Sequence, residues 1–172
     1  DTLTNNGVFA AVDGGRLSVL NGIDDFTNLN TGTLTGGLYR VGGDSRMDLN
    51  GDIMTNAAAI ELLGANARFD GLNALSSNEG ELTIAADAQF GLDGDLEFAS
   101  SSVFSVLVTG VGDMIDVPML DVAGTATLGG QLVLDFSGYA SPSEGTFRFL
   151  DAASFAGNWA QVDVVGIDPI LV

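Results

Sequence analysis

Apolar and polar residues alternate with a period of two along most of the chain. Residues two positions apart share one face of a β-strand, so each alternating pair predicts a short strand with one buried face. Gly, Asn, Asp or Ser fills nearly every interval between the pairs, as turns require. The predicted inward residues are Leu17 and Val19, Met47 and Leu49, Ile60 and Leu62, Ala67 and Phe69, Leu82 and Ile84, Ala88 and Phe90, Leu96 and Phe98, and Phe104, Val106 and Val108.

One stretch, TNAAAIELL at 55–63, has the composition of a helix. It is short for a helix, and it ends in the same alternation as its neighbours. We therefore predict a strand there and an all-β fold for the chain.

A repeated turn follows the same rhythm. An apolar residue followed by Thr-Asn ends at Asn5, Asn28 and Asn56, and a looser copy ends at Asn78, with spacings of 23, 28 and 22 residues. A period in the range of roughly 20–30 residues is typical of one coil of a parallel β-helix, or β-solenoid. In such a coil each asparagine could bond both its own turn and the asparagine of the next coil. The alternative is that Thr-Asn is only a common turn dipeptide.

The stretch TGTLTGGLYRVGG at 31–43 predicts a piece of wall. Strand parity points Leu34, Tyr39 and Val41 inward. It leaves Thr33, Thr35 and Arg40 outside, with Leu38 as an exposed apolar residue. We place the corners at Gly36-Gly37 and Gly42-Gly43, where glycine adopts positive φ at little cost.

The pattern changes near Val108. Residues 109–118 are predicted to form a linker or a wide turn. Longer strands are predicted after it, at Met119 to Val122, Gln131 to Phe136, Thr146 to Leu150 and Trp159 to Val164. This divides the chain into solenoid coils at 1–110 and a C-terminal β module at 111–172 that continues or caps the stack.

The composition restricts the partners. The net charge is −18, so nucleic acid and anionic membrane surfaces would be repelled. No apolar run approaches the roughly 20 residues of a membrane span, so we expect no direct membrane insertion.

The residue types restrict the chemistry further. The five basic residues are all arginine, and the chain has no His and no Cys. Without His, Cys or Lys there is no Ser-His-Asp triad, no thiol nucleophile and no Schiff base. We therefore expect no enzyme.

Acidic clusters are the weak metal candidates. Asp48, Asn50 and Asp52 have the D-x-N-x-D start of a calcium loop, but the glycine comes one residue early and Ala59 stands where the loop needs Glu. Asp93 and Asp95 form a second pair of weak candidates. We expect solvated acidic turns with no cofactor and at most weakly bound calcium.

Two other surfaces could bind glycans. An acidic wall of Asp25, Asp48 and Asp52 beside Arg46 would suit a carbohydrate-binding or carbohydrate-active β-helix, with Arg40 as a second candidate arginine. Tyr139, in the sequence GYASPSEG, is the best candidate for an exposed aromatic side chain that stacks on a sugar.

The apolar C-terminal residues Ile170, Leu171 and Val172 are predicted to take part in assembly. They have no evident partner in the sequence. They could dock on their own module, or add as a strand to an open sheet edge of a neighbouring copy.

The sequence also resembles the β-strand repeats of large secreted bacterial proteins, including autotransporter-type passengers. The runs GTLTGGLYRV at 32–41, DIMTNAAAIELLG at 52–64 and ALSS at 74–77 carry this resemblance. The segment at 119–162, from MLDVAGTATLGGQL to GNWAQV, is similar to the module that closes such passengers, with Trp159 where Phe is usual. The resemblance implies a parallel β-helix at the cell surface or outside a bacterium.

We therefore expect a non-enzymatic extracellular structural protein. It would be a β-solenoid subunit of a surface or matrix fibre, self-assembling head to tail by strand addition, or the stalk of an adhesin. The expected partners are other copies and extracellular glycans or matrix. The alternatives are the carbohydrate-binding or carbohydrate-active β-helix, and a fragment whose function lies in other parts of a longer protein.

Overall fold

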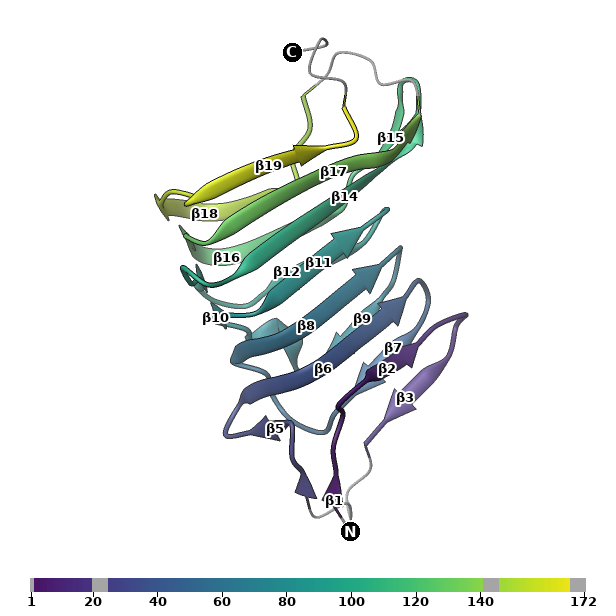
Figure 1. Ribbon diagram of the computed structural model, residues 1–172, viewed down its shortest axis with the longest axis vertical. Helices are drawn as coiled ribbons and strands as arrows, with labels where there is room; N and C mark the ends of the chain where they lie inside the picture. Colours follow the sequence, from purple (N-terminus) through teal and green to yellow (C-terminus); the bar gives the residue numbers. More distant parts are fainter. Residues whose placement is uncertain (1, 20–24, 141–145, 168–172) are drawn as a thin grey trace.

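The computed structural model describes residues 2–19, 25–140 and 146–167 and is all-β (Figure 1). In these ranges the one helix is a 3₁₀ turn, η1 (Leu72–Ala74), and no helix is long and apolar enough to span a bilayer. The strands are β1 (Thr2–Leu3), β2 (Val8–Ala11), β3 (Arg16–Ser18), β4 (Asp25–Phe26), β5 (Leu29–Asn30), β6 (Thr33–Gly42), β7 (Arg46–Asp48), β8 (Thr55–Leu63), β9 (Arg68–Asp70), β10 (Ser77–Asn78), β11 (Glu81–Ala85), β12 (Gln89–Leu92), β13 (Leu96–Phe98), β14 (Val103–Val111), β15 (Met114–Asp116), β16 (Met119–Leu128), β17 (Gln131–Ala140), β18 (Leu150–Gly157) and β19 (Gln161–Val165).

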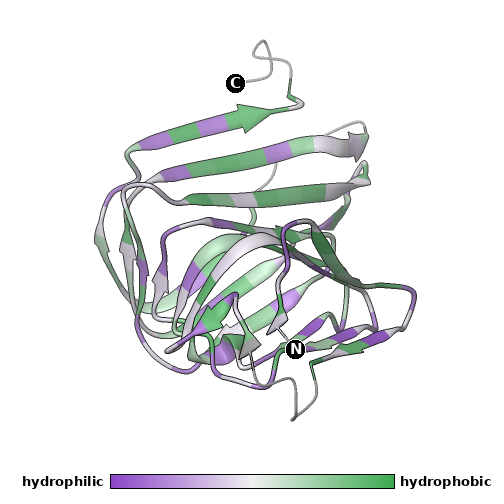
Figure 2. Ribbon diagram, turned by 60° about the horizontal axis from the view of Figure 1, so that its bottom comes forward, coloured by the Kyte–Doolittle hydropathy of each residue, from purple (hydrophilic) through white to green (hydrophobic). Residues whose placement is uncertain are grey.

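A continuous parallel ladder forms the main wall. Its strands pair in the order β2, β6, β8, β11, β14, β17 and β19. Figure 1 shows them stacked along the long axis, from β2 near the N-terminus to β19 near the C-terminus. The large sheet that contains this wall curls into a half-barrel (Figure 2).

A second wall is formed by strands that lie in the connections between successive strands of the main wall. The strands β3, β7 and β9 form a separate three-stranded parallel sheet. Further along the chain, β12, β16 and β18 pair in parallel and belong to the large sheet. Among the described residues β9 and β12 do not pair, so this second wall is interrupted between them.

The core is built from columns of apolar side chains that are in register from strand to strand. Because the strands are parallel and aligned, each inward side chain packs on the equivalent one of the next strand. One column is Phe9, Tyr39, Ile60, Leu82, Phe104, Leu132 and Val162, and its neighbour is Ala11, Val41, Leu62, Ile84, Val106, Leu134 and Val164.

The predicted alternation is confirmed at nearly every position. Of the predicted inward residues, all are buried except Leu17 and Phe90, which are partly buried and pack against the core. The stretch at 55–63 is strand β8, as predicted, with Ile60 and Leu62 in the core.

In the stretch at 31–43 the prediction of the inward residues is confirmed, and the prediction of a corner at Gly36-Gly37 is wrong. Leu34, Tyr39 and Val41 are fully buried. Gly36 and Gly37 lie inside β6, with φ of 59° and 63°, where the register with β8 shifts. This bulge inserts the residue that lets both Leu34 and Tyr39 face inward although they are an odd number of residues apart.

Three expectations for the C-terminal part are wrong. Residues 109–118 are a hairpin, in which β14 pairs antiparallel with β15, and not a linker. The strand predicted from Thr146 to Leu150 begins only at Leu150 and runs to Gly157. Tyr139 is buried in β17, where its hydroxyl donates to the carbonyl of Gly112, so it offers no exposed ring. The division at residues 110 and 111 stays a prediction.

The stacked columns predict which side chains hold the fold. Ile60 lies between Tyr39 and Leu82 and is fully buried. We expect Ile60→Ala to lower the free energy of unfolding by about 2–5 kcal/mol, because it leaves a cavity between two tightly packed neighbours. Urea unfolding followed by Trp159 fluorescence measures this loss. Thr83→Ala, on the outer face of the adjacent strand, is the control, with an expected change within about 0.5 kcal/mol. Equal losses in the two variants would contradict the assignment of faces.

Candidate functional site

The repeated asparagines are buried at a bend that flanks the main wall. Asn5, Asn28, Asn56 and Asn78 are at most 5% exposed. The Asn5 backbone N–H donates to Asn28 Oδ1 at 2.6 Å, and Asn28 Nδ2 donates back to the Asn5 carbonyl at 3.1 Å. Asn56 Nδ2 likewise donates to Asn78 Oδ1 at 2.7 Å.

Each pair also stabilises its own turn. Asn5 Oδ1 accepts from the backbone N–H of Gly7, and Asn56 Oδ1 accepts from that of Ala58, both at 3.0 Å. No buried side-chain nitrogen or oxygen in the described ranges lacks a partner. The asparagines therefore serve structural turns and leave no free group for a ligand.

The asparagines form two pairs and not one continuous column. In the register of β6 and β8, Asn56 lies opposite Leu34 and not opposite Asn28. The short antiparallel hairpin of β5 with β6 is inserted after Asn28, which accounts for the longer spacing of 28 residues.

A second ladder, which was not predicted from the sequence, is made of arginines and carboxylates on the outside of the sheet β3–β7–β9. Arg16, Arg46 and Arg68 are in register, and so are Ser18, Asp48 and Asp70. Arg16 pairs with Asp48 at 3.5 Å, and Arg46 pairs with Asp70 at 2.5 Å. The signal was present as R-x-S at 16–18 and R-x-D at 46–48 and 68–70.

These ion pairs are diagonal. Arg16 and Arg46 each reach the carboxylate that lies two positions along on the next strand. The hydrogen bond and the charge of Asp70 raise the pKa of the Arg46 guanidinium, and Asp48 adds to this to a smaller extent. The carboxylates hold together arginines that would otherwise repel one another along the column.

Part of the predicted acidic wall lines a shallow hollow. Asp48, Asn50, Asp52 and Arg46 line an open depression of about 500 Å³, together with Asp70. Asp48 Oδ1 accepts from the Asn50 backbone N–H at 2.9 Å, and Asp48 Oδ2 faces Arg16. The side chain of Asp25 lies outside the described residues. The assignment of this wall to glycan binding stays a prediction.

The other calcium candidates accept hydrogen bonds from the protein. Asp93 accepts from the Asn73 amide, and Asp95 Oδ1 accepts from the Thr125 backbone N–H at 2.7 Å. Within the described ranges no three acidic side chains gather closely enough to hold a metal ion. Weak calcium binding at these turns stays a prediction.

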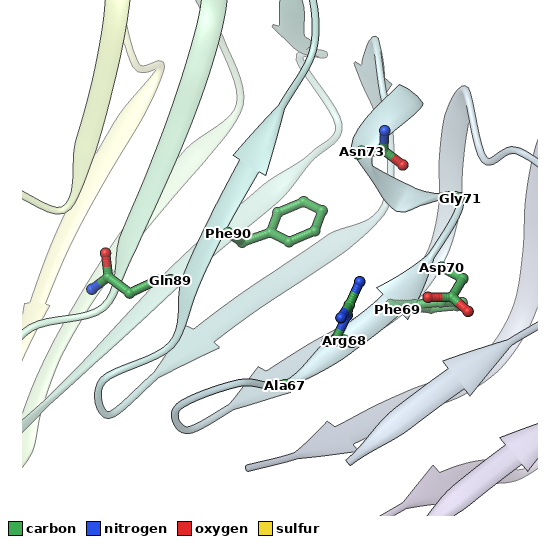
Figure 3. Close-up of a pocket in the computed structure, with 8 residues that line it drawn as sticks. All are labelled: Ala67, Arg68, Phe69, Asp70, Gly71, Asn73, Gln89 and Phe90. Atoms are coloured by element: carbon green, nitrogen blue, oxygen red, sulfur yellow. The ribbon is translucent and has the colours of Figure 1, made fainter. Parts of the chain in front are cut away.

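A second hollow lies where the second wall is interrupted. It measures about 300 Å³ and is lined by residues of β9, the turn into η1, and β12 (Figure 3). In Figure 3 the Arg68 side chain and the Phe90 ring project into the interval between β9 and β12, whereas Asp70 points away from it. Glycine at position 71 allows the chain to pass close to the preceding turn. A Cβ there would stand 2.2 Å from the Gly51 carbonyl oxygen.

The predicted assembly residues Ile170, Leu171 and Val172 lie outside the described residues. The strand before them, β19, pairs on one side only, with β17, in the part of the chain that is described. Val162 and Val164 end the two core columns and are 51% and 55% exposed.

The asparagine pairs can be tested by removing one amide. Asn56→Ala deprives the Ala58 N–H, Asn78 Oδ1 and the Glu81 carbonyl of their partner. We expect a loss of about 1–3 kcal/mol in the free energy of unfolding, since buried polar groups are left unsatisfied. Asn73→Ala removes an exposed amide and is the control, with an expected loss below about 1 kcal/mol. Chemical denaturation measures both, and a loss for Asn56→Ala no larger than for the control would contradict the structural role.

Tyr39 gives the fold a dependence on alkaline pH. Burial raises the pKa of its phenol from 10.0 to about 12, although a hydrogen bond with the Asn5 side chain partly offsets this. The neutral phenol thus contributes stability that is complete below pH 10 and is lost as the pH rises to about 12.

We expect the wild type to lose on the order of 2–3 kcal/mol more than Tyr39→Phe between pH 9 and pH 12. Urea unfolding of the two proteins at pH 9, 10, 11 and 12 measures the difference. Parallel pH profiles would show that Tyr39 ionises as readily in the folded protein as in the unfolded one.

Comparison with protein-family models, with curated proteins and with solved structures finds no match to this chain.

Proposed function

We propose that the chain is a non-enzymatic extracellular structural protein, a β-solenoid subunit of a bacterial surface or matrix fibre or the stalk of an adhesin. The observation that carries this proposal is the uninterrupted parallel ladder of the main wall with its stacked apolar columns. The hydrogen bonds between neighbouring strands run along the long axis of the stack. We therefore expect the fold to resist stretching and bending along its length.

The order of the strands supports a solenoid. The chain runs from the main wall to the second wall and back again, as in β6, β7, β8 and β9. Each return pairs in parallel with the preceding main-wall strand, which requires a crossover connection of a dozen or more residues. Between β6 and β8 the crossover consists of turns and the short strand β7, and the buried Asn56 lies just after it, at the start of β8.

The charge distribution supports a role outside the cell in a hydrated matrix. The net charge of −18 keeps the lateral faces of separate molecules apart and favours solubility. The resemblance to autotransporter-type passengers supports the same location. Self-association would then take place through the sheet edges and not through the lateral faces.

The open strands support assembly by strand addition. In the described ranges β2 pairs only with β6, and β19 pairs only with β17, so both present unpaired backbone groups. Such edges accept another strand. Val162 and Val164 of β19 are exposed, and an added strand would cover apolar surface there.

The absence of catalysis is part of the proposal. The acidic residues best placed for chemistry, Asp48 and Asp70, are engaged by Arg16 and Arg46.

Negative-stain electron microscopy of the purified chain tests the proposal. We expect filaments one coil-diameter wide at high protein concentration, present in calcium and unchanged after addition of a chelator, because no calcium is needed to join β2 to β19. A variant with Val164→Arg, which places a charge on the exposed end of a core column, should lose the filaments and remain folded. Discrete particles under all conditions would contradict self-assembly into filaments. Filaments that dissolve in the chelator would place the acidic turns in the contact.

A further inference from the structure

The interruption of the second wall leaves Arg68 without the carboxylate that the other two arginines of its column have. Arg16 and Arg46 each reach an aspartate two positions along on the next strand. Arg68 continues the column, is exposed, and has no ion pair with any described residue.

The equivalent position on the next strand can be identified from the turns. The N–H of Ala67 donates to the Gly64 carbonyl, and that of Ala88 donates to the Ala85 carbonyl, so the two turns are equivalent. Gln89 therefore corresponds to Arg68, and Gly91 corresponds to Asp70. A glycine stands where the earlier strands carry the carboxylate.

The place of the missing carboxylate is open space. A Cβ added at Gly91 would meet no atom within 4 Å, and the φ of Gly91 suits any residue. The hollow of about 300 Å³ is lined by its neighbours Gln89 and Phe90 and by Asn73, and Phe90 is partly exposed. This volume is at the lower end of small-molecule sites, which run from roughly 300 to 1,000 Å³.

We infer that this hollow binds a small organic acid, whose carboxylate takes the place of the missing aspartate on the Arg68 guanidinium. The guanidinium offers a planar pair of donors that matches a carboxylate, and such charge-assisted bonds are roughly twice as strong as neutral ones. The acid's body, the size of one sugar acid or one amino acid, would lie against Phe90. This binding function is separate from the proposed structural role.

The acidic surface limits the ligand to one with a single charge. Asp70, which lines the hollow, is paired with Arg46, and Asp93 accepts from Asn73, so these two carboxylates are engaged. The net charge of −18 would still repel a polyanion over a distance of about 10 Å at moderate salt. We expect a dissociation constant on the order of 1 mM for a single acid.

Two-dimensional ¹⁵N–¹H NMR titration of the whole chain tests the inference. The probes are galacturonate for a sugar source and glutamate for an amino-acid source, with galactose as the neutral match of the first. We expect saturable shifts at residues 67–71 and 89–91 with at least one acid and none with galactose. The tighter acid identifies the source of the carboxylate.

Two variants and two controls make the test specific. Arg68→Gln removes the cation, and Gly91→Asp supplies the missing carboxylate from the chain itself. Each should weaken binding at least about tenfold. Arg148→Gln removes an exposed arginine elsewhere, and Gly94→Asp adds the same charge at another open glycine, so both should bind as the wild type does.

The dispersion of the spectrum shows whether each variant is folded. Shifts that persist in Arg68→Gln, shifts that persist in Gly91→Asp, or no shift with either acid would each overturn the inference. None of these results bears on filament formation, which is measured separately.

Discussion

The parallel hydrogen-bond ladder of the main wall is the constraint on which the rest of the structure depends. Because side chains alternate across a strand, a slip of one residue would move every core residue of that strand to the outside. The ladder between β8, β11 and β14 therefore stays in strict register. Ile60, Leu82 and Phe104 then stack as one column, and their outward neighbours face the solvent.

The chain keeps this register although its repeats differ in length. The bulge at Gly36 and Gly37 adds one residue inside β6 without turning Tyr39 out of the core. The hairpin of β5 with β6 takes up the longest interval between asparagines. Similar register shifts occur in β14 against β17 and in β16 against β18. Irregular length is thus absorbed at bulges and bends, and the core columns remain regular.

Sequence reasoning identified the features that the core imposes. Burial requires apolar residues with a period of two, so the pairs Leu82 and Ile84 or Leu96 and Phe98 were visible in one sequence. Packing inside the bends requires Asn, so the repeat of Thr-Asn was visible as well. The features that could not be predicted from the sequence all depend on pairing between strands. Tyr139 was expected outside because nothing local shows that the hairpin of β14 and β15 would receive its hydroxyl.

The arginine ladder was hidden for a related reason. Outward positions tolerate many residues, so Arg16, Arg46 and Arg68 carry no periodic hydrophobic signal. Their alignment depends on connections of different length between β3, β7 and β9. The spacing of strands brings equivalent positions to within about 5 Å, so stacked arginines require carboxylates between them.

The second wall can be interrupted between β9 and β12 because the main wall also stabilises the fold. The main wall continues through β8, β11 and β14 beside the interruption, and Phe69 remains buried there. A gap in one wall therefore leaves the backbone ladder of the other intact. It leaves Arg68 in the outer column without a carboxylate partner among the described residues, and it leaves the inward Phe90 partly exposed beside the hollow. In a stack of parallel strands, an irregular connection of this kind is the place where the scaffold can acquire a local binding surface without losing its core.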